Sequence, residues 1–137
     1  MGRKVSNFLF INTGYIIAHI NSDDQHHREA LELSQKYEDY PVLTTDAILL
    51  EIGNALSRNA RQEAATIIHY FQTATEATVI PLTLDLLNSA IEMYKIHQDK
   101  TWGLVNCLSF VVMKKQQISI VLAFDRHFVQ AGFISAI

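Results

Sequence analysis

Residues 118–125 read Ile-Ser-Ile-Val-Leu-Ala-Phe-Asp, and this apolar run that stops at an aspartate is the clearest strand signal in the chain. A short apolar run bounded by polar residues is typical of a strand that is buried on both faces of a sheet. Residues 8–12 repeat the pattern as Phe-Leu-Phe-Ile-Asn. The sequence therefore predicts two buried strands, each followed directly by a polar side chain, Asn12 or Asp125.

Helical patterns separate the predicted strands. Further short strands are expected at 42–43 and 79–81, and helices at 13–20, from 23–24 onward, after a cap at 44–46, and at 62–74, 83–97, 103–114 and 126–131. Short strands that alternate with amphipathic helices imply a mostly parallel sheet with helices on both faces. We therefore expect one three-layer α/β/α domain with a central, mostly parallel sheet, spanning residues 1–137.

Composition narrows the class of protein. The chain has 137 residues, of which 49% are hydrophobic and 18% charged, and its formal net charge is −3. This balance argues against a protein that coats nucleic acid through bulk positive charge. The single cysteine, Cys107, excludes an intrachain disulfide and fits a reducing compartment. The basic and then apolar N-terminus is interrupted by polar residues and lacks a cleavage site, so we expect a cytoplasmic protein without a membrane segment.

Four polar side chains lie where a ligand site of such a fold is expected. Ligands bind outside the carboxyl ends of parallel strands, which is where Asn12 and Asp125 stand. Glu51 lies at the margin of an apolar helix face, and Asn106 is embedded in the apolar segment LVNCLSFVVM. A half-buried carboxylate is unfavourable unless it is paired or binds a cation. Cages made only of oxygen ligands suit Mg²⁺ or Mn²⁺, ions that support hydrolysis of phosphodiesters.

Each of these residues also has a simpler structural interpretation. Asp125 could cap the following helix, Asn106 could be a core amide with satisfied hydrogen bonds, and Glu51 could pair with Arg58 or Lys100. Thr13 could cap the first helix. Another polar cluster, Asp23, Asp24, His26 and His27, has the chemistry of metal ligands, but a solvated helix start explains it more simply.

Four stretches together resemble the PIN-domain family, and within it the VapC-type ribonuclease toxins of type II toxin–antitoxin systems. They are FLFINTGYIIAHINSDDQHH (8–27), LTTDAILLEIGNAL (43–56), DKTWGLVNCLSF (99–110) and AFDRHFVQAGF (123–133), and the resemblance covers essentially the whole chain. It implies a metal-dependent endoribonuclease that uses Mg²⁺ or Mn²⁺ and acts on RNA. It also implies a homodimer and a cognate antitoxin that covers the active site.

The family carries acidic residues at four positions that correspond here to Asn12, Glu51, Asn106 and Asp125. The resemblance assigns these four positions to catalysis and metal binding, and adds Asp99 as a further residue of the metal site. It also implies that Thr13 supports the site. Arg126, next to Asp125, could hold an RNA phosphate.

At positions 12 and 106 this chain departs from the family pattern, since asparagine stands where the family has an acid. An amide keeps the shape of the side chain and one oxygen ligand, but it loses the charge that attracts a divalent cation and cannot act as a general base. We therefore expect weak metal binding and impaired cleavage. We favour deliberate inactivation of a toxic nuclease as the explanation, with a naturally degenerate member as the alternative. A different function also stays open, a non-catalytic PIN-fold module that binds RNA or a protein partner.

Overall fold

The structure is a computed structural model that describes residues 7–137. The expected domain includes residues 1–6, which lie outside this described part. One parallel sheet has the strand order β3-β2-β1-β4-β5. The strands are β1 (Leu9–Ile11), β2 (Val42–Thr45), β3 (Ala77–Ile80), β4 (Ile120–Leu122) and β5 (Ile134–Ser135).

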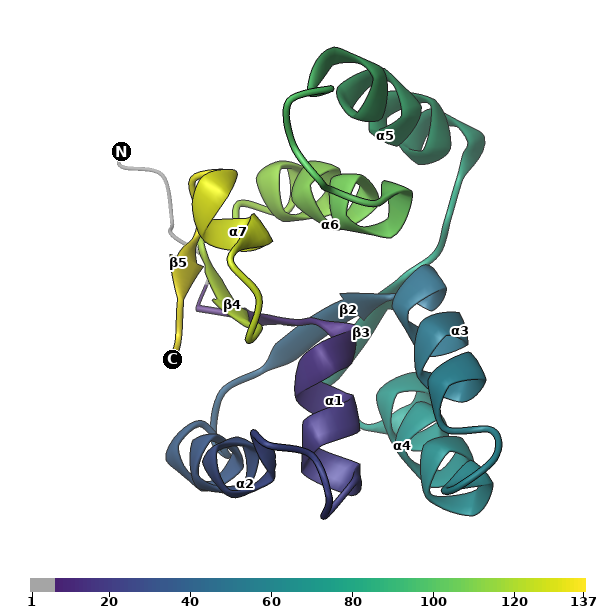
Figure 1. The fold of residues 1–137 in the computed structure, drawn as a ribbon, viewed down its shortest axis with the longest axis vertical. Helices are drawn as coiled ribbons and strands as arrows, with labels where there is room; N and C mark the ends of the chain where they lie inside the picture. The colour runs from purple at the N-terminus through teal and green to yellow at the C-terminus, as the bar shows by residue number, and fades with distance from the viewer. Residues whose placement is uncertain (1–6) are drawn as a thin grey trace.

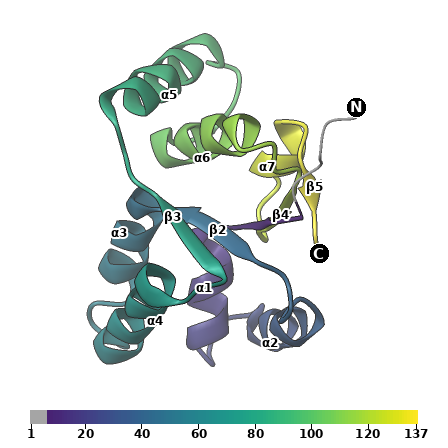
Figure 2. The same ribbon diagram turned by 180° about the vertical axis from the view of Figure 1, so that it is seen from behind.

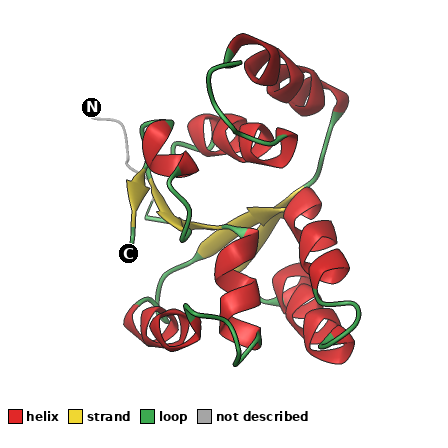
Figure 3. Cartoon of the chain, in the orientation of Figure 1, coloured by secondary structure: helices red, strands yellow, loops and turns green. Residues whose placement is uncertain are grey.

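Helices cover both faces of the sheet, which confirms the predicted three-layer α/β/α fold (Figure 1). The view from behind shows the same division, with α1 to α4 on one side and α5 to α7 on the other (Figure 2). The helices are α1 (Thr13–Ile20), α2 (His27–Lys36), α3 (Asp46–Ala55), α4 (Arg61–Thr73), α5 (Leu84–Ile96), α6 (Leu104–Lys115) and α7 (His127–Gln130). Figure 3 shows how short the strands are relative to the helices that enclose them.

The first strand occupies the centre of the sheet. Leu9 of β1 pairs with Val42 of β2 on one side and with Ile120 of β4 on the other. All three residues of β1 are buried, which explains why this strand is apolar without alternation. Beyond the end of β1, the backbone N–H of Asn12 donates to the carbonyl of Leu122 at 3.2 Å. The carboxyl ends of β1 and β4 are therefore level with each other.

The sequence predicted some strand boundaries incorrectly. The strand expected at 118–124 is shorter, because helix α6 ends in a turn where Gln117 has φ 59° and Ile118 N–H bonds back to the carbonyl of Met113. Strand β3 begins at Ala77 and stops before Pro81, which has no N–H to offer a neighbouring strand. The chain also has a strand that was not predicted, β5, which is only two residues long.

The start of α3 is fixed by three polar side chains at the end of β2. The Thr44 hydroxyl donates to the carbonyl of Ile11 at 2.9 Å, which ties β2 to the end of β1. The Thr45 hydroxyl accepts a backbone N–H in the first turn of α3 and so caps the helix. Asp46 accepts the backbone N–H of Leu82 with its carboxylate. These bonds hold α3, the helix that carries Glu51, against the carboxyl edge of the sheet.

Aromatic rings fill the core between β1 and the last part of the chain. The ring of Phe110 lies 5.0 Å from Trp102 and 5.0 Å from Phe128, centroid to centroid, in both cases edge to face. Trp102 is buried and anchors its loop in the core, and its indole N–H donates to Gln130 at 3.0 Å. We refer to these rings as the aromatic cluster, which consists of Phe10, Trp102, Phe110, Phe128 and Phe133.

Two further features of residues 7–137 are the environment of Cys107 and the character of the helices. Cys107 is fully buried in α6, where it acts as a small apolar core residue, and burial raises the pKa of its thiol. Across these residues, the structure contains no helix with the length and apolar character that a membrane crossing needs.

His19 makes the stability of the protein depend on pH. Burial, and then the nearby His27, lower the pKa of the His19 imidazole below its ordinary value of 6.5. Above pH 6.5 the ring is neutral in both the folded and the unfolded chain. As the pH falls through this value, the unfolded chain takes up a proton that the folded chain does not, and the free energy of unfolding falls.

We expect His19→Gln to lose part of this dependence. Urea unfolding at about pH 7.5 and about pH 5.5 measures it, and the drop in the free energy of unfolding should be smaller for the variant than for the unaltered chain. His69→Gln, on the exposed side of α4, is the matched control. Equal drops in His19→Gln and the unaltered chain would contradict the prediction.

Candidate active site

The side chains that follow β1 and β4 meet at the carboxyl edge of the sheet. The amide of Asn12, a side chain that is only 7% exposed, donates to Asp125 Oδ2 at 3.2 Å. The other carboxylate oxygen, Oδ1, accepts the backbone N–H of His127 at 2.9 Å. This bond forms a turn just before α7, but Arg126 holds the cap position of that helix, so the interpretation of Asp125 as the helix cap is wrong. The contact of Asp125 with Asn12 agrees with the prediction that both residues lie at this edge of the sheet.

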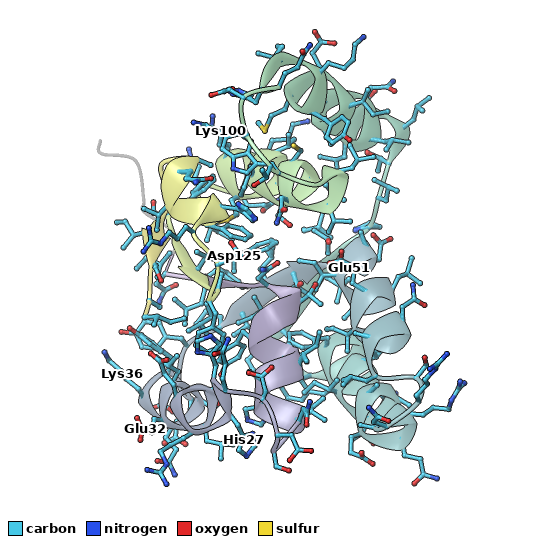
Figure 4. All side chains as sticks on the ribbon, viewed as in Figure 1. His27, Glu32, Lys36, Glu51, Lys100 and Asp125 are labelled. Carbon is cyan, nitrogen blue, oxygen red and sulfur yellow. The ribbon has the colours of Figure 1, made fainter. Side chains whose placement is uncertain are left out.

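A second pair of side chains lies directly beside the first. The Thr13 hydroxyl donates to Glu51 Oε1 at 2.5 Å. Asn12 and Thr13 are neighbours in the chain, and Asn12 contacts Asp125 while Thr13 contacts Glu51. Glu51 and Asp125 therefore lie on either side of the start of α1, as Figure 4 shows. The interpretation of Thr13 as a helix cap is wrong, since Asn12 holds the cap position of α1 and makes no side-chain capping bond.

Asn106 lies in the first turn of α6. Figure 1 shows α6 on the opposite side of the sheet from α1 and α3. The side-chain oxygen of Asn106 accepts the backbone N–H of Gly103 at 3.1 Å, so the amide helps to close the start of the helix. Asn106 is half-buried rather than a core side chain, and this bond accounts for the oxygen of its amide. Its participation in the site with Asn12, Glu51 and Asp125 stays a prediction.

Asp99 lies in the loop between α5 and α6. Its side chain is 71% exposed, and Oδ2 lies 3.3 Å from the ammonium of Lys100. The contact with Lys100, together with a backbone hydrogen bond, lowers the pKa of Asp99. Lys100 lies well apart from Glu51 and Asp125 (Figure 4), and its partner is Asp99 rather than Glu51, so the expected pairing of Lys100 with Glu51 is wrong. The role of Asp99 as a metal ligand remains a prediction.

Arg126 is exposed next to Asp125, at the edge of a hollow of about 530 Å³. The hollow lies between the end of β4, α7 and the C-terminal segment. Its position directly beside Asp125 leaves the guanidinium accessible to a ligand that reaches this carboxylate.

The polar cluster at the start of α2 has the structure of a helix start. Asp24 Oδ1 accepts the backbone N–H of His26 at 2.8 Å, and the His27 ring bonds the carbonyl of Ala18 at 2.8 Å. What sequence analysis missed is the ring of His26, which stacks on Phe124, the residue before Asp125, at a centroid distance of 4.2 Å. The signal available in the sequence was an aromatic residue, Phe124, next to the predicted site residue Asp125. Its partner His26 is distant in sequence, so the stacking could not be inferred.

The side chains present fit a divalent cation in the type of ligand but not in charge. Carboxylate and amide oxygens are suitable ligands for Mg²⁺ or Mn²⁺. Of the four predicted positions, however, only Glu51 and Asp125 carry charge, and one oxygen of Asp125 already accepts from the amide of Asn12. Within residues 7–137 no three His, Cys, Asp or Glu side chains are grouped closely enough to hold a metal ion.

Comparison with known proteins agrees with this fold. The model of the PIN domain family matches residues 9–134. The 23S rRNA-specific endonuclease VapC20 of Mycobacterium tuberculosis, in the strains CDC 1551 / Oshkosh and ATCC 25618 / H37Rv, is 30% identical over 126 residues, which cover 92% of this chain and 95% of the relative. The crystal structure of M. tuberculosis VapC20, described as a sarcin-ricin loop cleaving toxin, superposes with a TM-score of 0.82 at 31% identity, over 92% and 96% of the two chains.

This chain belongs to the PIN-domain family, whose nucleases are metal-dependent. Within the family it is a homologue of the VapC-type ribonuclease toxins, which confirms the resemblance predicted from its sequence.

Proposed function

We propose that this chain is the ribonuclease toxin of a VapBC-type toxin–antitoxin pair, with an active site weakened by asparagine at positions 12 and 106. The proposed site consists of Asn12, Glu51, Asn106 and Asp125, with Asp99 as a further metal ligand. The observation that carries the proposal is the pair of contacts Asn12–Asp125 and Thr13–Glu51, which gathers two carboxylates at the ligand-binding edge of a VapC-like fold.

Glu51 and Asp125 would hold Mg²⁺ or Mn²⁺ in this site. Such an ion, when bound, stabilises the charge of phosphoryl transfer and lowers the pKa of a water molecule. Groups of the protein itself hold the two carboxylates in position. Thr13 fixes one oxygen of Glu51, and the backbone of His127 fixes one oxygen of Asp125, so both carboxylates keep their orientation without a ligand. Arg126 would bind an RNA phosphate beside Asp125.

The weakening follows from electrostatics. Oxygen ligands attract a divalent cation largely through their negative charge, and the two asparagines remove two of the four charges that the family pattern has. In addition, the amide N–H of Asn12 donates to Asp125 Oδ2, one of the oxygens that would bind the cation. Neutral amides also cannot take a proton from water as a general base.

The similarity to the VapC-type toxins is also the basis for proposing a substrate and partners. The relatives are named for cleaving 23S rRNA, so we propose that the substrate is a structured ribosomal RNA with an unpaired segment. We further propose a homodimer, a cognate antitoxin that covers the active site, a cytoplasmic location, and a single domain that spans residues 1–137.

A non-catalytic binding module is the second candidate function. It is favoured by the contact between Asn12 and Asp125, which satisfies both side chains without any ion. Such a module would use the same edge of the sheet to bind RNA or a protein partner. The test that separates the two functions is an RNA cleavage assay with Mg²⁺ or Mn²⁺ on the variant Asn12→Asp, Asn106→Asp, since a binding module gains no cleavage from these changes.

The single change Asn12→Asp should make the stability of the protein depend on metal. It removes the donor of a largely buried hydrogen bond and places a second carboxylate 3.2 Å from Asp125 Oδ2. We expect the free energy of unfolding in EDTA to fall by about 1–3 kcal/mol. Mn²⁺ should restore most of this loss, because an ion that binds only the folded state stabilises it.

Urea unfolding with EDTA and with Mn²⁺ measures both effects. The matched control is Asn88→Asp, which adds the same charge on the exposed side of α5 and should show neither. If Asn12→Asp is as stable as the unaltered chain in EDTA and gains nothing from Mn²⁺, positions 12 and 125 do not share a metal site.

A further inference from the structure

Three rings form a column that runs from the core to the surface next to Asp125. Tyr15 of α1 is 5% exposed, and its ring lies 6.4 Å from that of Phe124, stacked with an angle of 30° between the planes. The ring of His26 lies 4.2 Å from that of Phe124, with only 6° between the planes. We call Tyr15, Phe124 and His26 the ring column.

The outer end of the ring column is an aromatic surface in contact with solvent. The side chain of His26 is 38% exposed, whereas Tyr15 at the inner end is buried. The backbone of His26 is held by Asp24, and its Nδ1 lies 3.8 Å from Glu29 Oε1. The ring is thus held in place from its edge and from one face, while part of the side chain stays in contact with solvent.

The position of the ring column links it to the candidate active site. Phe124 directly precedes Asp125, and consecutive Cα atoms are only about 3.8 Å apart. The carboxylate of Asp125 contacts Asn12, and the exposed Arg126 follows it. A surface for stacking, a carboxylate and a cation are therefore linked through three consecutive residues, Phe124, Asp125 and Arg126.

We propose that His26 is the stacking site for an unpaired base of the RNA, next to the nucleotide whose phosphate reaches Asp125. The proposal rests on the proposed function for its class of ligand. Every nucleobase has a flat π face, so an aromatic ring binds unpaired RNA with little dependence on sequence. A base inside a helix has both faces covered by its neighbours. The ring column therefore selects single-stranded or flipped-out nucleotides for the site.

The test is equilibrium binding of RNA to the unaltered chain. Because its proposed active site is weakened by Asn12 and Asn106, we expect too little cleavage to disturb the measurement. Fluorescence anisotropy with a short, unstructured, fluorescein-labelled RNA oligonucleotide reports the dissociation constant. His26→Ala should weaken binding about tenfold, the scale of one lost base–aromatic stack. His26→Phe keeps a ring on Phe124 and should bind within about twofold of the unaltered chain. His69→Ala, which removes an exposed histidine of α4, is the matched control and should change nothing.

A second set of oligonucleotides tests whether the contact that His26 makes is with a base of the RNA. Oligonucleotides that carry a single abasic site, moved along the strand one position at a time, should include one that binds more weakly to the unaltered chain. For that oligonucleotide His26→Ala should cause no further loss, because the two changes remove the same contact.

Three results would overturn the proposal. The unaltered chain could fail to bind the oligonucleotide, His26→Ala could bind as tightly as the unaltered chain, or His26→Phe could lose as much affinity as His26→Ala. The proposed function fails separately, when Asn12→Asp, Asn106→Asp binds RNA through His26 and yet does not cleave it.

Discussion

The double variant Asn12→Asp, Asn106→Asp is expected to cleave RNA in the presence of Mg²⁺ or Mn²⁺ about 10²- to 10⁴-fold faster than the unaltered chain, the scale that general-base assistance contributes in enzymes. The two changes bring the number of acidic residues at the four predicted positions from two to four. More negative charge increases the affinity for a divalent cation.

The structure indicates that the fold tolerates both changes. Aspartate has nearly the shape of asparagine. At position 106 a carboxylate oxygen can accept the backbone N–H of Gly103 as the amide oxygen does now, and negative charge near the start of a helix is favourable. The gain in activity should therefore be measured on a folded protein, with the repulsion between positions 12 and 125 relieved by the bound ion.

Cleavage of a radiolabelled ribosomal RNA fragment, with and without EDTA, measures the gain. Glu51→Gln added to the double variant should return the rate to that of the unaltered chain, because it removes a charge while keeping the shape. Asn54→Asp and Asn88→Asp, which place two charges at exposed positions, serve as the matched control. Equal cleavage by the double variant and the unaltered chain would contradict the proposed role of positions 12 and 106.

The change Phe110→Ala is expected to have the largest effect on stability. Phe110 is fully buried and lies at the centre of the aromatic cluster, in contact with the rings of Trp102 and Phe128. Truncation removes apolar surface and leaves a cavity, which costs about 3–5 kcal/mol. Since domains of this size unfold with only about 5–15 kcal/mol, the loss is a large fraction of the total.

Urea unfolding followed by circular dichroism measures the loss. Phe110→Leu keeps most of the volume and should lose clearly less, and Tyr94→Ala removes a ring that is 51% exposed on α5 and should lose under about 1 kcal/mol. A loss in Phe110→Ala no greater than that in Tyr94→Ala would show that the aromatic cluster is not central to the core.

The sequence predicted the centre of the fold and two of the site positions for a clear physical reason. Strands β1 and β4 are covered on both faces, so they appear as continuous apolar runs, and the first polar residue after each run marks the edge of the sheet. This reasoning placed Asn12 and Asp125 at the same edge, and the structure confirms that they are in contact.

Other features depend on distant contacts and left no local pattern. Strand β5 has two residues and exists because Ile134 pairs with Ile120, which a sequence of this length cannot signal. The hydroxyl of Thr13 was as compatible with a helix cap as with Glu51, since both partners suit a hydroxyl. Asp99 was assigned from the family pattern alone, and its loop has no periodicity from which its neighbours could be inferred.

The hydrogen bond between Asn12 and Asp125 joins residues that are 113 positions apart. Contacts between such distant residues close late, because the entropy of a long loop is lost before the contact forms. During translation β1 leaves the ribosome long before β4, which must insert beside it to complete the centre of the sheet. A nascent chain that has not yet released β4 therefore lacks the contact between Asn12 and Asp125, and the candidate site cannot form until β4 has been synthesised.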